Sequence, residues 1–209
     1  MWELIKTGGW LMLPIILSSV ASLAITLERA WALRRDRIAP HNLVAQVWVW
    51  IKNNQMDAKK IKELRDGSPL GRILATGLAH SKQGRDVMKE SMMDAAAREI
   101  FDMNRFMNTL TVIANTAPLL GLLGTVIGMM DVFNVIVIKG NGNPALLAGG
   151  ISKKLITSAG GILVAVPTMY FHHFLSAKIS NLIQHMEIES IKLVEVLHGE
   201  RDVETEVRS

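Results

Sequence analysis

The sequence contains no cysteine, and its charged residues are absent from long parts of the chain. Without cysteine there is no disulfide framework, no thiolate metal site and no cysteine nucleophile. The sequence also lacks a phosphate-binding glycine loop, a metal-ligand cluster and a nucleophile placed beside a base, so we expect neither an enzyme nor a bound cofactor or metal. No basic run carries interleaved aromatic residues, and we therefore expect no nucleic-acid partner.

The missing charges define three apolar runs. Residues 7–27, 106–130 and 155–177 contain no Asp, Glu, Lys or Arg. A helix needs roughly 20 apolar residues to cross the hydrocarbon layer of a bilayer, and each run is long enough. The first run does not begin with a basic cluster and exceeds the usual apolar core of a signal peptide, so we interpret it as a retained helix. The pattern predicts an all-α integral membrane protein with three transmembrane helices.

Positive charge is unevenly distributed between the connections. Fourteen of the 23 Lys and Arg residues lie between Arg34 and Arg105, whereas 139–154 contains only three. The positive-inside rule therefore places 34–105 in the cytoplasm, the N-terminus outside and the C-terminus inside. The expected organisation is an outer N-terminal segment (1–9), transmembrane helix 1 (10–33), a cytoplasmic helical domain (34–105), transmembrane helix 2 (106–138), a short periplasmic turn (139–154), transmembrane helix 3 (155–177) and a cytoplasmic tail helix (178–209).

The cytoplasmic segment reads as helical with breaks. Short helices are predicted at 42–52 and 57–66, and Pro69 suits the first position of a third helix that ends near Lys82. The stretch 85–138 contains no glycine or proline before Pro118, which predicts one long helix that leaves the membrane into the cytoplasm. Apolar residues recur at helical spacing in the tail, which predicts an amphipathic helix packed against 85–105 or a sister subunit.

Two polar stripes run along the second and third spans. The residues of the stripe in the second span are separated by three, four or seven positions, and those in the third span by three or four. Each set therefore shares one helix face. Such stripes should face protein or water rather than acyl chains. Helix packing alone and packing combined with a hydrated path both remain open. The stripes comprise Asn104, Asn108, Thr111, Asn115, Leu122 and Thr125, and then Lys154, Ser158, Gly161, Ala165, Thr168 and His172.

Glycines and prolines in the same spans favour close helix packing with some bending. The positions assigned to packing are Pro118, Gly121, Gly124, Gly128, Gly161 and Pro167. Asp131 near the outer end of its span is a candidate functional carboxylate or an interfacial group, and it is placed to pair with Lys153 or Lys154. The adjacent His172 and His173 point in different directions on a helix, so we expect interfacial side chains rather than a shared metal ion.

Two motifs identify a resemblance. The signature of the MotA/TolQ/ExbB proton-channel family resembles two segments of this sequence, APLLGLLGTVIGM at 117–129 and GISKKLITSAGGILVAVP at 150–167. Within the family, these residues are most similar to those of ExbB. The resemblance covers nearly the whole chain and includes the order of three spans. It implies a homo-oligomer, expected to be a pentamer, in the bacterial inner membrane. Its second and third helices would line a central pore around the helices of an ExbD-like partner, and proton-motive force would energise a TonB-like protein.

The resemblance also assigns residues. The family's pore threonine corresponds to Thr125 and its pore hydroxyl in the third span to Ser158, and we expect Thr157, Asn115 and Thr111 to line the same proton pathway. Lys153, Lys154 and Asp131 would be charges at the pore mouth. Lys153 departs from the family, in which glutamate is usual in this motif, so a carboxylate role in proton transfer does not carry over to it.

Three alternatives remain at this level. A TolQ-like role in envelope maintenance and a MotA-like stator are the rivals within the family. A stator usually has four spans and a larger cytoplasmic domain, and the short outer turn favours ExbB. From another class of protein, the chain would be a scaffold that assembles a partner without passing ions.

Overall fold

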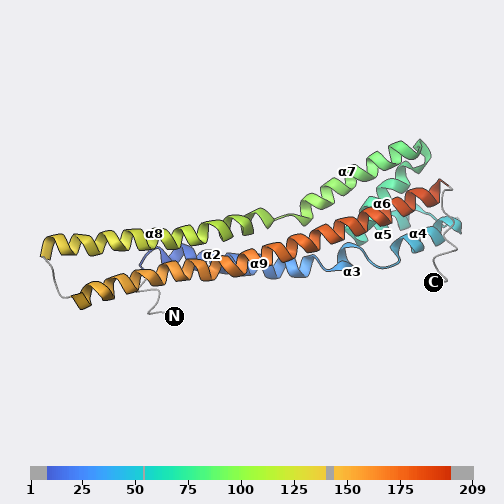
Figure 1. Cartoon of the computed structure of the whole chain (residues 1–209). Coiled ribbons are helices and arrows are strands. Elements are labelled where there is room, and N and C mark those ends of the chain that lie inside the picture. The colour runs from blue at the N-terminus through green and yellow to red at the C-terminus, as the bar shows by residue number, and fades with distance from the viewer. Residues whose placement is uncertain (1–8, 54, 140–143, 199–209) are drawn as a thin grey trace. The chain divides into compact units, whose positions relative to one another are not determined.

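Figure 1 shows the protein as a computed structural model that describes residues 9–53, 55–139 and 144–198. Within these ranges every regular element is helical, which confirms the all-α prediction. The chain divides into two compact units, one formed by Met1–Arg29 and Phe106–Leu175 and the other by Ala30–Arg105 and Ser176–Ser209.

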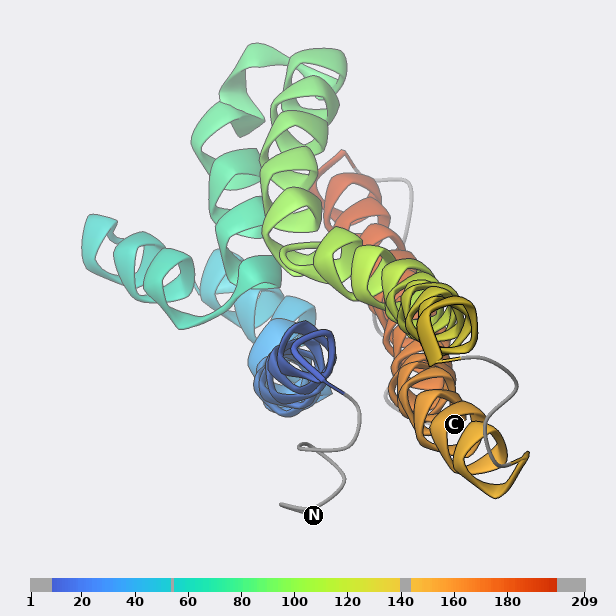
Figure 2. The ribbon, with the colours of Figure 1, turned by 90° about the vertical axis from the view of Figure 1, so that its left-hand side faces the viewer.

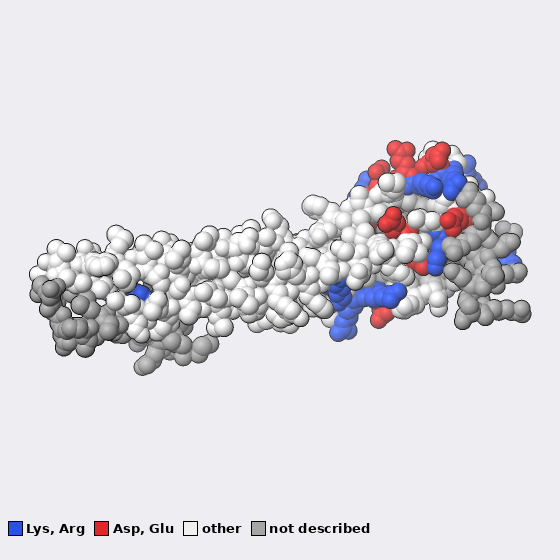
Figure 3. Space-filling view, viewed as in Figure 1, with Lys and Arg blue, Asp and Glu red and all other residues white. Residues whose placement is uncertain are grey.

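The first unit contains the predicted membrane spans. Its helices are α2 (Met12–Ala32), α8 (Met107–Lys139) and the N-terminal part of α9 (Pro144–Leu197). Three helices of the described chain are long and apolar enough to cross a membrane, which agrees with the number of spans expected from the charge-free runs. In Figure 3 the surface of these helices carries very few charged side chains, whereas charged side chains gather over the second unit.

The second unit is built mainly from short helices. They are α3 (Arg35–Ile38), α4 (Leu43–Lys52), α5 (Ala58–Gly67), α6 (Pro69–His80), the 3₁₀ turn η1 (Ser81–Gln83) and α7 (Arg85–Met103). Two of them, α5 and α6, begin at polar side-chain caps. Asp57 accepts from the Ala58 amide at 2.7 Å, and Ser68 accepts from the Gly71 amide at 3.0 Å with Pro69 at the first helical position. The helices predicted at 42–52 and 57–66 and the start at Pro69 are confirmed.

Helices α6 and α7 lie side by side in the second unit (Figure 2). Leu74 of α6 and Met88 of α7 are fully buried, and Gly77 lies against the Met92 side chain. A charged pair joins the same helices: Arg72 donates to both carboxylate oxygens of Glu99 at 2.6 Å each. The hydrogen bond to Glu99 raises the pKa of Arg72 above its usual value, so the guanidinium is permanently charged.

The expectation of one unbroken helix over 85–138 is wrong at one place. The helix stops at Met103 and restarts at Met107, and Phe106 adopts a left-handed conformation with φ 63°. At the break the side-chain amide of Asn104 donates to the Ile100 carbonyl at 2.9 Å, in addition to the ordinary helical bond from its backbone N–H at 3.0 Å. An asparagine that bonds back in this way ends helices, whereas our prediction had considered only glycine and proline as breaks. Asn104 therefore does not belong to the polar stripe of α8.

The C-terminal part of α9 is the predicted amphipathic tail helix. Ile179, Met186 and Leu193 are buried while Ile188 and Ile191 are exposed. Side chains of this segment and of α7 line one groove of about 380 Å³, so the tail packs along the 85–105 stretch, one of the two partners expected for it. The last part of the predicted tail segment, residues 199–209, and part of the predicted outer turn, 140–143, lie outside the described residues.

Candidate functional site in the membrane helices

A row of glycines brings α8 and α9 into close contact. A methyl group built on Gly121 would lie 3.0 Å from the Ser158 Cα, and one built on Gly124 would lie 2.6 Å from the Thr157 Cγ2. Gly128 meets the Lys154 side chain in the same way. Only hydrogen fits at these distances, so the glycines set how closely the two helices approach.

The contact continues toward the middle of the helices. Gly161 lies against the backbone carbonyl of Ala117, which is fully buried. Pro118 and Pro167 both lie inside their helices, each one or a few residues from this contact. A proline inside a helix removes one backbone hydrogen bond and permits bending, so both helices have a built-in irregular point beside their closest approach.

The hydroxyls assigned to the proton pathway flank this contact. Thr157 is fully buried against Gly124, whereas Ser158 on the next position of α9 is half-buried. Thr125 of α8 is also half-buried, and its hydroxyl donates to the Leu122 carbonyl at 2.7 Å. That bond uses the only hydroxyl hydrogen, so the Thr125 oxygen is left to accept from water or from a protonated partner.

Asn115 and Thr111 lie further along α8 and differ in their surroundings. Asn115 is exposed on the surface of the single chain. Thr111 is half-buried, and its hydroxyl lies 2.9 Å from Nε2 of His172 on α9. Sequence analysis assigned His172 to the interface and missed this pair, although His172 ends the α9 stripe and Thr111 belongs to the α8 stripe. Pairing the two stripes with each other would have suggested it.

A third helix takes part through a pair that sequence analysis also missed. The hydroxyls of Ser22 on α2 and Thr168 on α9 lie 2.7 Å apart, and both residues are buried. Thr168 belongs to the stripe recognised on the third span. The matching signal on the first span is the series Ser19, Ser22, Thr26 and Arg29, with spacings of 3, 4 and 3 that place them on one face.

Arg29 and Phe106 meet at the ends of the two segments that make up this unit. The buried Arg29 pairs with Glu28 at 2.9 Å, and its guanidinium lies 5.4 Å from the centre of the Phe106 ring. The ring of Phe106 provides a cation–π partner to a cation that is removed from water. Phe106, at the helix break, thus contacts a residue near the C-terminal end of α2.

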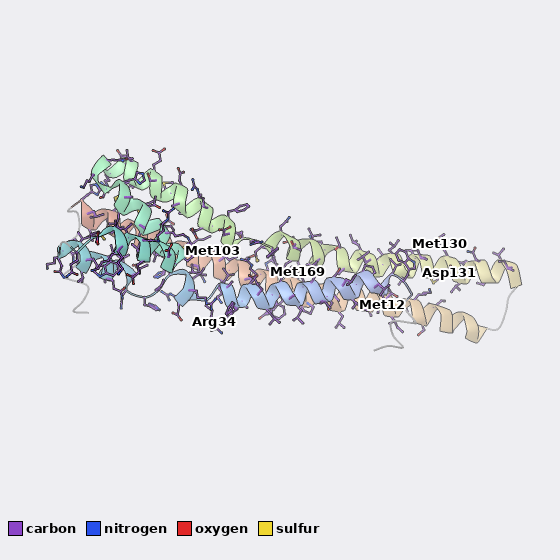
Figure 4. All side chains as sticks on the ribbon, turned by 180° about the vertical axis from the view of Figure 1, so that it is seen from behind. Met12, Arg34, Met103, Met130, Asp131 and Met169 are labelled. Atoms are coloured by element: carbon purple, nitrogen blue, oxygen red, sulfur yellow. The ribbon has the colours of Figure 1, made fainter. Side chains whose placement is uncertain are left out.

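Charged groups are sparse in the described part of this unit. Asp131, which follows Met130 on α8 (Figure 4), lies 3.8 Å from the Lys154 ammonium. The expected pairing of Asp131 with Lys154 is present, but the length of the contact and the exposed carboxylate make it weak. The side chain of Lys153 lies outside the described residues. Among the residues that the structure describes, no three His, Asp or Glu side chains form a group able to hold a metal ion.

All of α8 and most of α9 fall in a region that matches a known family. The model of the MotA/TolQ/ExbB proton channel family matches residues 65–188. The chain belongs to this family. This is a family of proton channels, and the two motifs recognised in the sequence lie within the matched region.

Individual relatives are similar over different parts of the chain. ExbB-like 1 of Synechocystis sp. is 34% identical over 162 residues, which cover 76% of this chain and 64% of the relative. The ExbB homolog of Methanothermobacter thermautotrophicus is 27% identical, with 89% and 66% covered. The Tol-Pal system protein TolQ of Pseudomonas aeruginosa is 24% identical, with 95% and 92% covered. The chain thus spans just under two thirds of the length of the first two relatives.

Proposed function

We propose that the chain is the channel-forming subunit of a proton-driven motor in the bacterial inner membrane. With an ExbD-like partner it uses proton-motive force to energise a TonB-like protein for active transport across the outer membrane, iron uptake included. The lysine and arginine distribution supports an N-terminus in the periplasm and a C-terminus in the cytoplasm. The membrane boundaries that follow are 10–33, 106–138 and 155–177.

One observation carries the proposal: polar side chains remain on the membrane surface of the single chain. Asn115 is exposed and Thr125 is half-exposed on α8, beside exposed large apolar groups such as Leu119, Leu122 and Val126. An amide gains nothing from acyl chains. The polar face of α8 is therefore expected to turn toward a pore or a sister subunit, which supports a homo-oligomer, for which we propose a pentamer.

The chemistry of this face suits passage of protons better than their storage. In a ring of Thr125 and Ser158 hydroxyls, the Thr125 oxygen accepts hydrogen bonds and the Ser158 hydroxyl is able to donate or accept, and neither holds a fixed charge. No carboxylate lies among the five residues assigned to the pathway, so we propose that the ExbD-like partner supplies the titrating group. Thr157, which is buried beside Gly124, would hold α9 in place, while Asn115 and Thr111 extend the polar lining toward the cytoplasm.

A second candidate function rests on the TolQ relative, which covers nearly the whole chain. In that case the same pore would act in envelope maintenance with a TolR-like partner. A scaffold that passes no ions is the third possibility. The two motor roles share the pore chemistry and differ in the partner, so the partner decides between them.

The first experiment is co-purification of the chain with candidate ExbD-like and TolR-like partners, followed by mass measurement of the intact complex. A five-copy complex that holds the ExbD-like protein and captures a TonB-like protein would support the proposal. Selective capture of the TolR-like protein would move the function to envelope maintenance. Failure to retain any partner would count against both motor roles.

The second experiment separates a conducting pore from a scaffold. Thr125→Val keeps the shape of the side chain and removes the hydroxyl, so a scaffold should keep its function whereas the motor should lose energised uptake. Thr116→Val is the matched control on α8, because the Thr116 hydroxyl is bonded to the Val112 carbonyl at 2.8 Å and is not assigned to the pathway. Lys153→Glu restores the usual family residue and tests whether the lysines at the pore mouth slow cation entry.

A further inference from the structure

A separate pocket lies between α2 and α9, beside the buried pair of Ser22 and Thr168. Its volume is about 130 Å³, and its polar lining comes from both helices. Such a pocket is unexpected between two apolar helices, because helix packing in membranes normally excludes voids. The residues that matter for its chemistry are Ser19, Ser22, Thr26, Leu163, Pro167 and Thr168.

The hydrogen bonds on the floor of the pocket leave acceptors unused. Thr168 donates its hydroxyl hydrogen to the Val164 carbonyl at 2.7 Å, so Ser22 must be the donor in the 2.7 Å contact with Thr168. Ser22 has then spent its hydrogen and retains free lone pairs. A ligand that donates hydrogen bonds would satisfy them.

Thr26 leaves a donor unused in the same place. The residue is 6% exposed, and its hydroxyl oxygen is buried without a hydrogen-bond partner in the described part of the chain. A buried hydroxyl without a partner is costly. Pro167 adds a backbone acceptor, because it has no N–H to offer to the carbonyl of Leu163, which borders the pocket.

We propose that this pocket binds water inside the membrane. A water molecule there accepts from the Thr26 hydroxyl and donates to Ser22, and a buried water needs two to four such partners. The volume holds more than one molecule. The contact between α2 and α9 is therefore hydrated rather than dry, and α2 is held to α9 through hydroxyls and water in addition to apolar packing.

A lipid acyl chain is the competing occupant. Leu23 and Leu163 are exposed at the edge of the pocket, at 58% and 75%, so its mouth is apolar. An acyl chain would cover these leucines but leave the Thr26 hydroxyl without a partner. The unsatisfied Thr26 hydroxyl therefore favours water.

Water-edited solid-state NMR of the full chain in bilayers, with 13C-labelled threonine, tests the proposal directly. Magnetisation from water should reach Thr26 and Thr168 several-fold faster than Thr116, whose hydroxyl is bonded to the Val112 carbonyl and which lines neither this pocket nor the assigned pathway. Equal and slow transfer to all three, or faster transfer from acyl-chain protons to Thr26 than from water, would overturn it.

A stability measurement provides an independent check. Thr26→Val keeps the shape and removes the donor, so a hydrated pocket should lower the melting temperature by about 2–4 °C, while Thr116→Val should change it little. Water transfer to Thr168 should also slow in the Thr26→Val protein. A melting temperature that is unchanged or raised would show that the Thr26 hydroxyl has no water partner, since removing an unsatisfied group stabilises a fold.

Discussion

Replacing Arg72 by methionine should destabilise the second unit by leaving the buried Glu99 carboxylate without its partner. The guanidinium donates two bonds of 2.6 Å to Glu99, whose side chain is only 11% exposed. Methionine keeps most of the volume but offers no donor. The effect falls on the contact between α6 and α7, because each helix contributes one member of the pair.

The magnitude follows from the exposure of the two side chains. Removing one partner of a fully buried ion pair costs about 3–5 kcal/mol. The Arg72 side chain is 41% exposed, so water screens part of the interaction, and we expect about 2 kcal/mol. For a chain of this size that corresponds to a fall of roughly 4–8 °C in melting temperature.

Thermal unfolding of the purified protein, followed by circular dichroism in one fixed detergent, measures the change. The double variant Arg72→Met with Glu99→Leu removes both charges and should recover at least half of the loss, since no unpaired carboxylate remains. Lys62→Met, at an exposed lysine of α5, is a control for loss of a positive charge in the same unit. If the double variant is less stable than Arg72→Met alone, the reasoning about an unpaired buried charge is wrong.

Three further predictions concern other contacts. Gly124→Ala should destabilise the α8–α9 contact by about 1–3 kcal/mol, because the added methyl would lie 2.6 Å from the Thr157 side chain. Gly149→Ala is the control: no atom lies within 4 Å of its added methyl, so it should be nearly neutral in the same thermal assay. Burial and then the charge of Arg35 lower the pKa of His185. As the pH falls from about 7 through the ordinary histidine pKa near 6.5, the unfolded chain therefore takes up a proton before the folded chain does, and the free energy of unfolding should decrease. Melting temperatures measured at several pH values should show this decrease, and His185→Gln should remove it. Because Phe106 has φ 63°, Phe106→Gly should be more stable than Phe106→Ala by about 1 kcal/mol although both lack the ring, and equal melting temperatures would argue against a left-handed backbone there.

The helices predicted in the second unit were confirmed because the sequence signals for them are local. Ser68 followed by Pro69 starts a helix through bonds within one turn, and the tail helix could be recognised from the spacing of Ile179, Met186 and Leu193. The break before Phe106 was missed although its cause is also local. An asparagine that bonds back to the preceding turn does not stand out in a sequence as glycine and proline do.

The polar stripes were only partly interpretable from the sequence. Spacing showed that Thr168 and His172 share a face of α9, but periodicity within one helix contains no information about which neighbour meets that face. The structure pairs Thr168 with Ser22 of α2 and His172 with Thr111 of α8. Two different helices thus contact one stripe, which sequence analysis had treated as a single surface.

The sequence by itself determined the class of this protein, because three charge-free runs are each long enough to cross the hydrocarbon layer of a bilayer as a helix. It also determined the family, because the two motifs lie in order along the chain. Only the tertiary structure decided which hydroxyls are buried between helices and which stay on the surface, as with Thr157 and Asn115. Residues such as Thr26 and Ser22 acquire their chemistry from the distance to another helix, and that distance is set by packing between segments far apart in the chain.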